Sequence, residues 1–523
     1  MLMVLKNGET LGPFWGKTVR TSSGRNHLGM WATSIATYAR LLPGLTNQTL
    51  RIRYYSFYAW VLNHYIYKLK SKNQLDLWVI MRRAELLFAF STFVFSDEQQ
   101  GYPGIKFIKG KFTQNDVLRG KVFNFAVISD ATSNSYWKHK KGAFGQYYFA
   151  PLRTIGIIGE DDKGELAITT KGQELAVAFQ SSISEAFGDI FVKAIVKGEI
   201  KTSDLKKICT RINCSSVPLK SRELELLIKL LLEINNGDNF RRETILSIIK
   251  SALLTNIVEP TEFPRTVYFN STRENKAIKF DEFNTTSEMW RFYQINEFSH
   301  FAFETIFCFI LRQLQKDAYW VSVDVCVELF ITEVMNTINK ILPGVNRIKR
   351  TTLITEILKK LEAFKKVTWY KVGSPLQLST LREKGDVSTA ILLIFVLFVR
   401  HQNEFSSFST LAKKHGVARD GYFLQLFDNL KKYETRTFEK FLRHTLIFEI
   451  INRHLRVAYQ KIAHSSHNTL KFAYENEQIM WLDNFDLAWT HPRLVALMNF
   501  LRDLNVLDSK GFVTKLGCQL NGN

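Results

Sequence analysis

The sequence predicts a mainly α, multi-domain helical protein with two winged-helix-like modules that contain small β-hairpins. Three observations carry this prediction. The chain of 523 residues is longer than one hydrophobic core usually supports. Apolar residues recur at helical spacing over most of its length. Only two stretches, one near residue 160 and one near residue 510, combine short apolar strands with a charged turn between two helices.

Apolar periodicity, turn residues and charge divide the chain into six expected segments. These are a basic N-terminal helical region with a signature motif over residues 1–105, a winged-helix-like module over 106–182, a helical region over 183–257, a linker over 258–289, a helical domain over 290–463 and a C-terminal winged-helix-like module over 464–523. The linker is placed by Pro260, Pro264 and a run of polar residues.

Two helices are expected in the first segment. Residues 46–69 place Leu50, Tyr54 and other apolar residues at helical spacing, with Thr46 or Asn47 as the cap. Residues 78–95, rich in Leu and Phe, form the second.

The two winged-helix-like modules repeat one order of elements. In the first, a helix over 144–155 is followed by a strand at 157–158, a charged turn at 159–164, a return strand at 166–169 and a helix over 173–179. In the second, a helix over 492–504 is followed by a strand at 506–507, a turn at 508–511 and a return strand at 512–513. Both helices end in a Leu-Arg-x-[Ile/Leu]-x-[Ile/Val]-[Ile/Leu] pattern. A hairpin beside a helix that can enter a groove is typical of winged-helix proteins.

The charge distribution favours a polyanionic partner. The net charge is +21, and residues 1–157 hold 21 Lys and Arg against 7 Asp and Glu, which gives +14 there. Between Glu9 and Asp76 the chain has nine basic residues and no acid. Solubility alone is the alternative explanation.

The sequence leads us to expect a cytoplasmic protein without a membrane partner. Its five cysteines are odd in number and form no Cys-x-x-Cys pair, which favours free thiols in a reducing compartment. No signal peptide is expected at the start. The longest apolar run, from Ala390 to Val399, is too short to cross a bilayer and is predicted to be a buried helix.

No catalytic motif, cofactor site or metal site is predicted. The Gly12–Thr18 segment has one residue too few between its glycines for a phosphate-binding loop. His464 and His467 have no further metal ligand close in sequence. Glu297, His300 and Glu304 share one helix face but have no second set, so a buried polar network is the simpler interpretation. The sequence therefore favours a non-enzyme, and leaves open an active site built from scattered residues.

Basic and aromatic residues indicate where nucleic acid would bind. We expect phosphate contacts from basic residues near the signature helix and near the helix of the first module, namely Arg40, Arg53, Lys138, Lys140, Lys141 and Arg153. On the helix over 46–69, Arg53 lies farther from the apolar stripe than Arg51, so Arg53 is expected to be exposed. Arg51, Tyr55 and Tyr58 are expected to be structural.

One stretch resembles a known group of sequences. It comprises Trp31–Ser34, Tyr38–Thr49 and Arg51–Tyr58, and the last two read YARLLPGLTNQT and RIRYYSFY. It is similar to the PG-x-[ST]-N-x-T-x-R-x-RYYSFY signature of uncharacterised bacterial proteins that are encoded near restriction and antiphage genes. Residues 144–148 and 290–294 are also similar to that group. The resemblance implies a role in defence against mobile DNA, and it assigns no chemistry.

Together, these observations predict a nucleic-acid-binding scaffold subunit of a bacterial antiphage system. Its partners would be nucleic acid, foremost duplex DNA, and protein subunits of the same system, among them a separate ATPase or nuclease. A metal-dependent nuclease with an unrecognised active site, and a protein-interaction scaffold that binds no nucleic acid, remain the alternatives.

Overall fold

The computed structural model is mainly helical, as predicted. The residues that it describes are 26–69, 75–96, 100–130, 135–215, 217–233, 238–256, 258–272, 274, 276–317, 319–341, 347–366, 386–417, 422–462 and 469–522.

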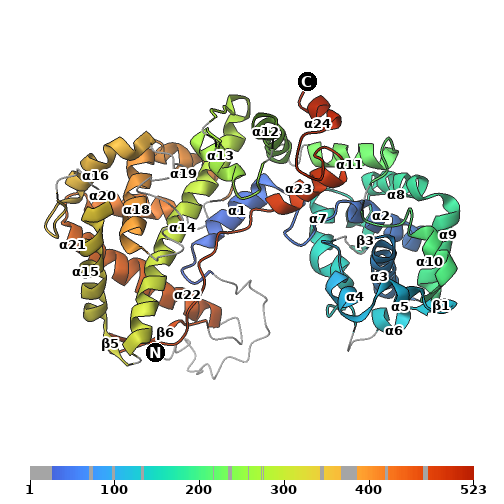
Figure 1. The fold of residues 1–523 in the computed structure, drawn as a ribbon, viewed down its shortest axis with the longest axis horizontal. Helices are drawn as coiled ribbons and strands as arrows, with labels where there is room; N and C mark the ends of the chain where they lie inside the picture. The colour runs from blue at the N-terminus through green and yellow to red at the C-terminus, as the bar shows by residue number, and fades with distance from the viewer. Residues whose placement is uncertain are drawn as a thin grey trace. The chain divides into compact units, whose positions relative to one another are not determined.

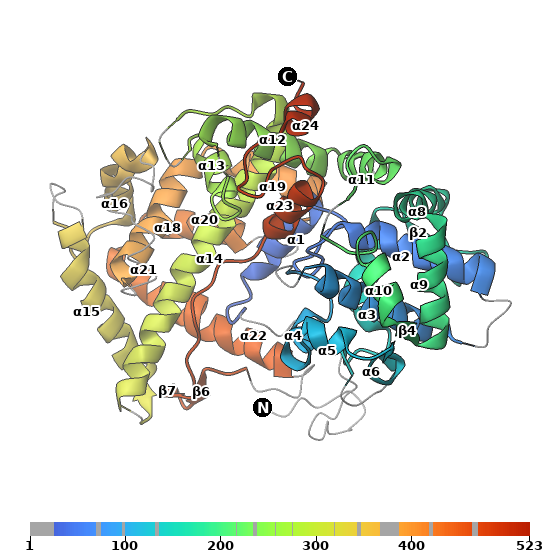
Figure 2. The ribbon, with the colours of Figure 1, turned by 45° about the vertical axis from the view of Figure 1, so that its right-hand side comes forward.

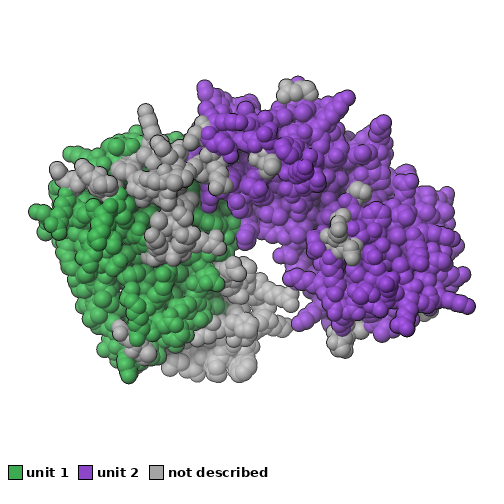
Figure 3. Space-filling model, in the orientation of Figure 1, with its two compact units in different colours: residues 1–38, 288–490 green, residues 39–287, 491–523 purple. Residues whose placement is uncertain are grey.

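The chain forms two compact units, and each is built from two separate stretches of sequence (Figure 3). Unit 1 contains residues 1–38 and 288–490, and unit 2 contains residues 39–287 and 491–523. The last expected segment, 464–523, is therefore shared between the units. The two helices α1 (Trp31–Leu41) and α14 (Asn284–Asp317) each contain a boundary between them.

Unit 2 carries the signature motif and both predicted winged-helix-like stretches. Its helices are α2 (Arg53–His64), η1 (Tyr65–Leu69), α3 (Leu77–Phe95), α4 (Ile105–Lys111), α5 (Gln114–Leu118), α6 (Ala126–Asp130), η2 (Phe144–Tyr148), α7 (Phe149–Thr154), α8 (Thr170–Ile183), α9 (Glu185–Lys197), α10 (Thr202–Ile208), α11 (Arg222–Leu232), α12 (Phe240–Thr255), α13 (Phe263–Phe269), η3 (Asp281–Phe283), α23 (Leu494–Asp503) and α24 (Lys515–Leu520). Its strands form two antiparallel pairs, β1 (Val122–Asn124) with β4 (Glu199–Lys201) and β2 (Ile158–Glu160) with β3 (Leu166–Ile168).

Helix α2 is the central element of unit 2. It packs against α8 and α3, and nearly all of its residues are buried (Figures 1 and 2). Phe57 stacks on Phe88 of α3 with 4.0 Å between ring centroids, and Tyr54 meets the same ring edge to face. Its polar residues Arg53 and Ser56 are buried as well, and both bond to Glu223, so α2 has no solvent-facing side.

Two sequence-based boundaries differ from the structure. The signature helix begins at Arg53 rather than near residue 46, because residues 46–52 form turns in which Thr46 and Thr49 bond to each other. The expected linker over 258–289 contains α13, η3 and the start of α14. Pro264 does not prevent α13, since proline is tolerated in the first turn of a helix.

Both stretches that were predicted to be winged-helix-like modules have a local order of helix, hairpin and helix. The first runs from η2 and α7 through β2 and β3 to α8. The second runs from α23 through a bridge between Leu507 and Val513 to α24.

The two stretches also share the details of their bonding. Thr169 and Thr514 each cap the following helix by accepting a hydrogen bond from the amide of Gly172 or Gly517, at 3.1 and 3.2 Å. A Cβ atom on either glycine would lie 2.2 or 2.5 Å from the backbone carbonyl that precedes the hairpin. Only glycine lets helix and hairpin approach so closely.

The hairpin turns are equally alike. Asp161 accepts hydrogen bonds from the amides two and four residues later, and Asp508 accepts the same pair. Gly164 and Gly511 occupy the matching positive-φ position, at +75° and +95°. The two stretches are thus two copies of one local motif.

Unit 1 is a second helical unit with one small sheet. Apart from the parts of α1 and α14 that it contains, its helices are α15 (Val323–Ile341), α16 (Ile354–Leu361), η4 (Glu362–Lys366), α18 (Val387–His401), α19 (Phe405–Lys414), α20 (Tyr422–Tyr433), α21 (Phe438–His444), η5 (Thr445–Asn452) and α22 (Arg453–Ile462). Strands β5 (Val321–Ser322), β7 (Gln478–Trp481) and β6 (Phe472–Glu475) form an antiparallel sheet in that order.

The most apolar helix of unit 1 is α18. Ala390 to Val399 are all buried, as predicted for this run. Across the described residues, no single helix is both long and apolar enough to span a membrane. Helices α8 and α9 would reach that length only as a pair, and they meet at a bend of 107°.

Candidate nucleic-acid interface

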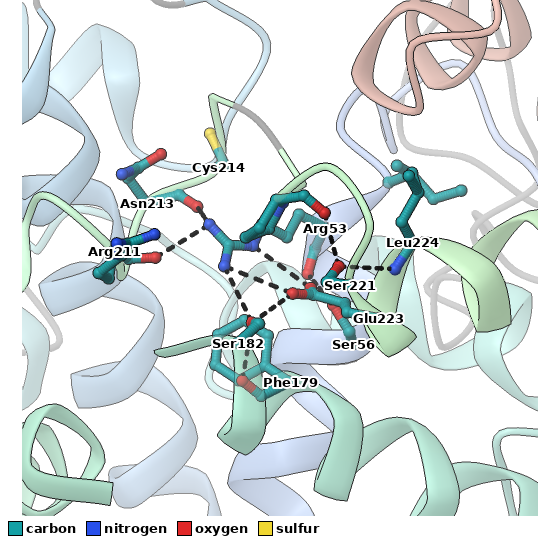
Figure 4. A network of polar contacts seen from close by, with 12 residues as sticks. Arg53, Ser56, Phe179, Ser182, Arg211, Asn213, Cys214, Ser221, Glu223 and Leu224 are labelled. Carbon is teal, nitrogen blue, oxygen red and sulfur yellow. Dashed lines mark hydrogen bonds and ion pairs between the residues drawn. The ribbon is translucent and has the colours of Figure 1, made fainter. Parts of the chain in front are cut away.

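Arg53 is buried, so the prediction that it is exposed is wrong. Its side chain is 2% exposed, and its Nε and Nη2 atoms lie 3.3 and 3.4 Å from the two carboxylate oxygens of Glu223 (Figure 4). Nη1 donates to the carbonyls of Arg211 and Asn213, and the guanidinium lies over the ring of Phe179. The prediction failed because it assumed a helix with one exposed face, whereas α2 is enclosed on all sides.

The partner of Arg53 is itself fully bonded. Glu223, at the start of α11, also accepts hydrogen bonds from the hydroxyls of Ser56 at 2.6 Å and Ser182 at 2.5 Å. A buried ion pair is tolerated when further hydrogen bonds satisfy both partners, which is the case here. Arg53 therefore joins α2, α8 and α11 and makes no surface contact.

Arg51 has a structural position too, as expected. Its Nε and Nη2 atoms contact both carboxylate oxygens of Asp503 at 3.1 and 2.8 Å. Nη2 also donates to the carbonyls of Cys214 and Ser215. The side chain is 12% exposed. Both signature arginines thus bind the chain between residues 211 and 215, and Arg51 ties the C-terminal motif to it as well.

The two signature tyrosines are buried. The Tyr55 hydroxyl donates to the carbonyl of Gly44 at 2.7 Å. The Tyr58 hydroxyl donates to Oε2 of Glu85 at 2.6 Å. Burial and the neighbouring carboxylate raise the pKa of Tyr58 well above its ordinary value, so the phenol stays protonated and donates.

Glu85 of α3 holds a basic loop, which we define as residues 135–143. Its two carboxylate oxygens accept from Tyr58, from the Tyr136 hydroxyl at 2.7 Å and from the amides of Ala143 and Phe144 at 3.0 and 2.9 Å. Burial raises the pKa of Glu85, and these hydrogen bonds oppose the rise. The carboxylate lies at the first amides of η2, where a negative charge is favoured.

Arg82, three residues before Glu85 on α3, also holds the loop. Its guanidinium donates to the carbonyls of Ser129, Trp137 and His139. Gly142 has φ +65°, and a Cβ there would lie within 3.4 Å of Arg82, Glu85 and Tyr136. The loop therefore has one tightly specified backbone path.

The basic loop presents its lysines to solvent. Lys138, Lys140 and Lys141 are all exposed, and no described carboxylate lies within ion-pair distance of them. The Lys141 ammonium lies 4.3 Å from the centroid of the Trp78 ring, which is partly exposed. A buried acid and a buried arginine thus support a surface rich in positive charge.

Five further cations lie close to this loop, and the sequence analysis did not single them out. They are the exposed residues Lys106, Lys109, Lys111, Arg119 and Lys121 of α4, α5 and the segment that follows. The start of α4 adjoins the loop, since a Cβ on Gly104 would lie 3.2 Å from the Tyr136 ring. Helices α4 and α5 lie together in both views (Figures 1 and 2). The sequence could have indicated this group, because three lysines lie within the seven residues Ile105–Lys111.

The two carboxylates of this stretch form no ion pair with these cations, although hydrogen bonds from Thr113, and with them the charge of Arg119, lower the pKa of Asp116. Residues 101–159 contain only Asp116 and Asp130. Asp116 caps α5 by bonding to the amide and hydroxyl of Thr113, and Asp130 is paired with Arg83 at 2.5 Å. We call the eight cations, Lys106, Lys109, Lys111, Arg119, Lys121, Lys138, Lys140 and Lys141, the basic surface.

Two other predicted phosphate-binding residues are already paired. Arg40 forms an ion pair with Asp238, and Arg153 forms one with Glu160 of β2 at 3.0 Å. Arg153 is half exposed, but the hairpin beside it is acidic: Glu160, Asp161, Asp162 and Glu165 are all exposed around Lys163. These two arginines do not belong to the basic surface.

The remaining sequence motifs show no further site in the described chain. Glu297, His300 and Glu304 are buried in unit 1, with His300 between the two carboxylates at 3.1 and 3.4 Å. Burial disfavours a charged His300, yet the two glutamates outweigh it and raise its pKa to about 10. Among the described residues, no three His, Cys, Asp or Glu side chains are placed to hold a metal ion. Gly12–Thr18, His464 and His467 lie outside the described residues.

No family model, curated protein or solved structure matches the chain.

Proposed function

We propose that this chain is a nucleic-acid-binding scaffold subunit and that its basic surface contacts the phosphate backbone. The observation that carries the proposal is the set of eight exposed cations without a described carboxylate at ion-pair distance. Neutralising phosphates with such groups releases condensed counterions, which is the main source of affinity in non-specific binding. The contact residues are Lys138, Lys140, Lys141 and their five neighbours, in place of Arg40, Arg53 and Arg153.

The support beneath the basic loop favours a binding role. Loops that carry function are usually held by a rigid scaffold. Here Arg82 and Glu85 are both buried and bond to the loop at four backbone or hydroxyl groups, those of Tyr136, Trp137, His139 and Ala143, and Glu85 also accepts from the amide of Phe144, which follows the loop.

In this proposal the two copies of the helix–hairpin–helix motif are winged-helix-like modules. The basic loop directly precedes η2 and α7, the helix of the first copy, so phosphate contacts there would position that helix against nucleic acid. The hairpin tip of the first copy is excluded as a phosphate contact, because its exposed acids outnumber Lys163. The resemblance of residues 31–58 to proteins encoded near antiphage genes suggests partner subunits from the same defence system, one of them an ATPase or nuclease.

The proposal is tested by measuring which lysines nucleic acid protects from acetylation. Protein would be treated with acetylating reagent alone and with mixed DNA and RNA oligonucleotides at about 50 mM salt. We expect protection of Lys138, Lys140 and Lys141. Lys413 and Lys414 of α19 are also exposed and serve as the control that should react unchanged. Equal reactivity of all five lysines with and without nucleic acid would contradict the proposal.

A second candidate function, a protein-interaction scaffold, is favoured by a groove in unit 1. A cavity of about 450 Å³ lies between α14 and α15, and it is lined by Phe309, Val325 and Leu329 together with Asp324 and Glu328. Val325 and Leu329 are 50% and 41% exposed, which is unusual for neighbouring apolar residues on one helix face. If this groove binds a subunit encoded beside this chain, Leu329→Glu should abolish their co-purification and leave the fold intact.

A further inference from the structure

The lysines of the basic loop lie among aromatic side chains. Trp78, Trp137 and Tyr147 are all partly exposed, although most aromatic residues of unit 2 are buried. Trp137 is in the loop itself, directly before Lys138, and Trp78 carries the Lys141 ammonium over its ring. Tyr147 lies on η2 and meets Trp137 edge to face at 5.9 Å.

The Trp137 ring is held in place at the surface. Its indole nitrogen donates to Oε1 of Gln146 at 2.9 Å, and its backbone carbonyl accepts from both terminal nitrogens of Arg82. The ring of the preceding residue, Tyr136, provides the buried anchor of the loop. The Trp137 indole is thus partly exposed, and its contacts with Gln146 and Tyr147 hold the ring in one orientation.

Whether the nucleic acid is double-stranded or single-stranded determines whether bases can stack on these aromatic rings. In a duplex the base faces are stacked on one another, so a protein reaches only base edges and phosphates. In a single strand the faces are free, and each base that stacks on an aromatic side chain adds affinity independent of sequence. Alternating cations and partly exposed rings are therefore typical of single-strand binding.

We propose that the basic loop binds single-stranded nucleic acid, with Trp137 and Tyr147 stacking on bases while Lys138, Lys140 and Lys141 bind the intervening phosphates. This inference rests on the proposed function and narrows its ligand from the expected duplex to a single strand.

The test compares four probes and three proteins. Fluorescein-labelled oligothymidine, oligouridine, a DNA duplex and an RNA duplex of equal length are titrated with wild-type protein, Trp137→Ala and Trp137→Phe in about 50 mM salt. Wild-type protein should bind a single strand more tightly than either duplex. Trp137→Ala should weaken that binding by about tenfold or more, and Trp137→Phe, which keeps a ring, should recover most of it.

The salt dependence of the affinity separates the contribution of base stacking from that of phosphate contacts. Trp137→Ala should leave the slope of log affinity against log salt unchanged, because no phosphate contact is lost.

Comparing oligothymidine with oligouridine shows whether the protein prefers single-stranded DNA or single-stranded RNA. Equal or tighter duplex binding, or full affinity of Trp137→Ala for both single strands, would overturn this inference and leave the proposed function standing. Binding of none of the four probes would overturn both. Thermal melts of the variants verify that they are folded.

Discussion

The Tyr58 hydroxyl lies 2.6 Å from Oε2 of Glu85, and through this bond the signature motif supports the basic loop. Tyr58 belongs to the RYYSFY sequence of α2, and Glu85 bonds to both ends of the loop through Tyr136 and the amide of Ala143. The motif that is most distinctive in the sequence is therefore buried. In the proposed function, its role is to hold the basic loop in place through Glu85.

Removing this bond should destabilise unit 2. Tyr58→Phe leaves one oxygen of a buried carboxylate with fewer donors, so we expect a loss of about 1–3 kcal/mol in the free energy of unfolding. Tyr67→Phe is the control, because Tyr67 is 60% exposed and its hydroxyl bonds to Gln173 at the surface. Denaturant unfolding of both variants provides the measurement. A smaller loss for Tyr58→Phe than for Tyr67→Phe would refute this role of the signature.

Arg53→Ala should be among the most destabilising changes in the chain. It strands the buried carboxylate of Glu223, which typically costs about 3–5 kcal/mol. Arg153→Ala breaks an exposed ion pair and should cost less than about 1 kcal/mol. Replacing Arg53 and Glu223 together by methionine should cost less than Arg53→Met alone, because no charge is then left unpaired. Chemical denaturation would contradict the account if the double variant were the least stable.

Acid should destabilise unit 1 through His454. Its ring is buried, with Nδ1 3.1 Å from the carbonyl of His27 and Nε2 accepting from the amide of Lys471 at 3.0 Å. This arrangement requires the neutral ring, and burial lowers the pKa of His454 from 6.5 to about 4. Since the folded form resists protonation, the stability is complete above pH 6.5 and is lost as the pH falls towards 4.

The measurement is the melting temperature of wild-type protein and His454→Gln across that pH range. The wild-type value should fall more steeply, because the glutamine does not titrate. Burial also lowers the pKa of the neighbouring His27, to about 3, so some acid sensitivity should persist in the variant. Parallel curves for the two proteins would exclude His454 as a source of the acid sensitivity.

The sequence predicted the helical class and the order of local elements well. Residues 78–95 and the helix–hairpin–helix stretches were placed within a few residues, because apolar spacing, Gly164, Gly511 and the Thr-to-Gly caps act over short distances. The short strands β1 and β4 were missed, since their pairing joins residues near 123 and 200 and only three residues of each take part.

The site was predicted less well than the fold. Lys138, Lys140 and Lys141 were chosen from charge alone, because no acid lies near them in sequence, and the structure exposes all three. Whether Arg53 is buried depends on its ion pair with Glu223, which is 170 residues away in sequence. It also depends on whether α2 has a face exposed to solvent. Local periodicity carries no information about either. The same limit explains why Arg40 and Arg153, which pair with acids only in the fold, were expected to bind phosphate.

The salt dependence of nucleic-acid binding tests the central claim most directly. Affinity for an oligonucleotide is measured over a range of salt for wild-type protein, for the variant with Lys138, Lys140 and Lys141 changed to Ala, and for a control with Lys413, Lys414 and Lys432 changed to Ala. All six lysines are exposed, and both variants remove the same charge. We predict a clear negative slope for the wild type and the control. The slope should be flatter by roughly 2–3 units for the loop variant. Absence of binding at about 50 mM salt, or identical slopes for all three proteins, would contradict the account.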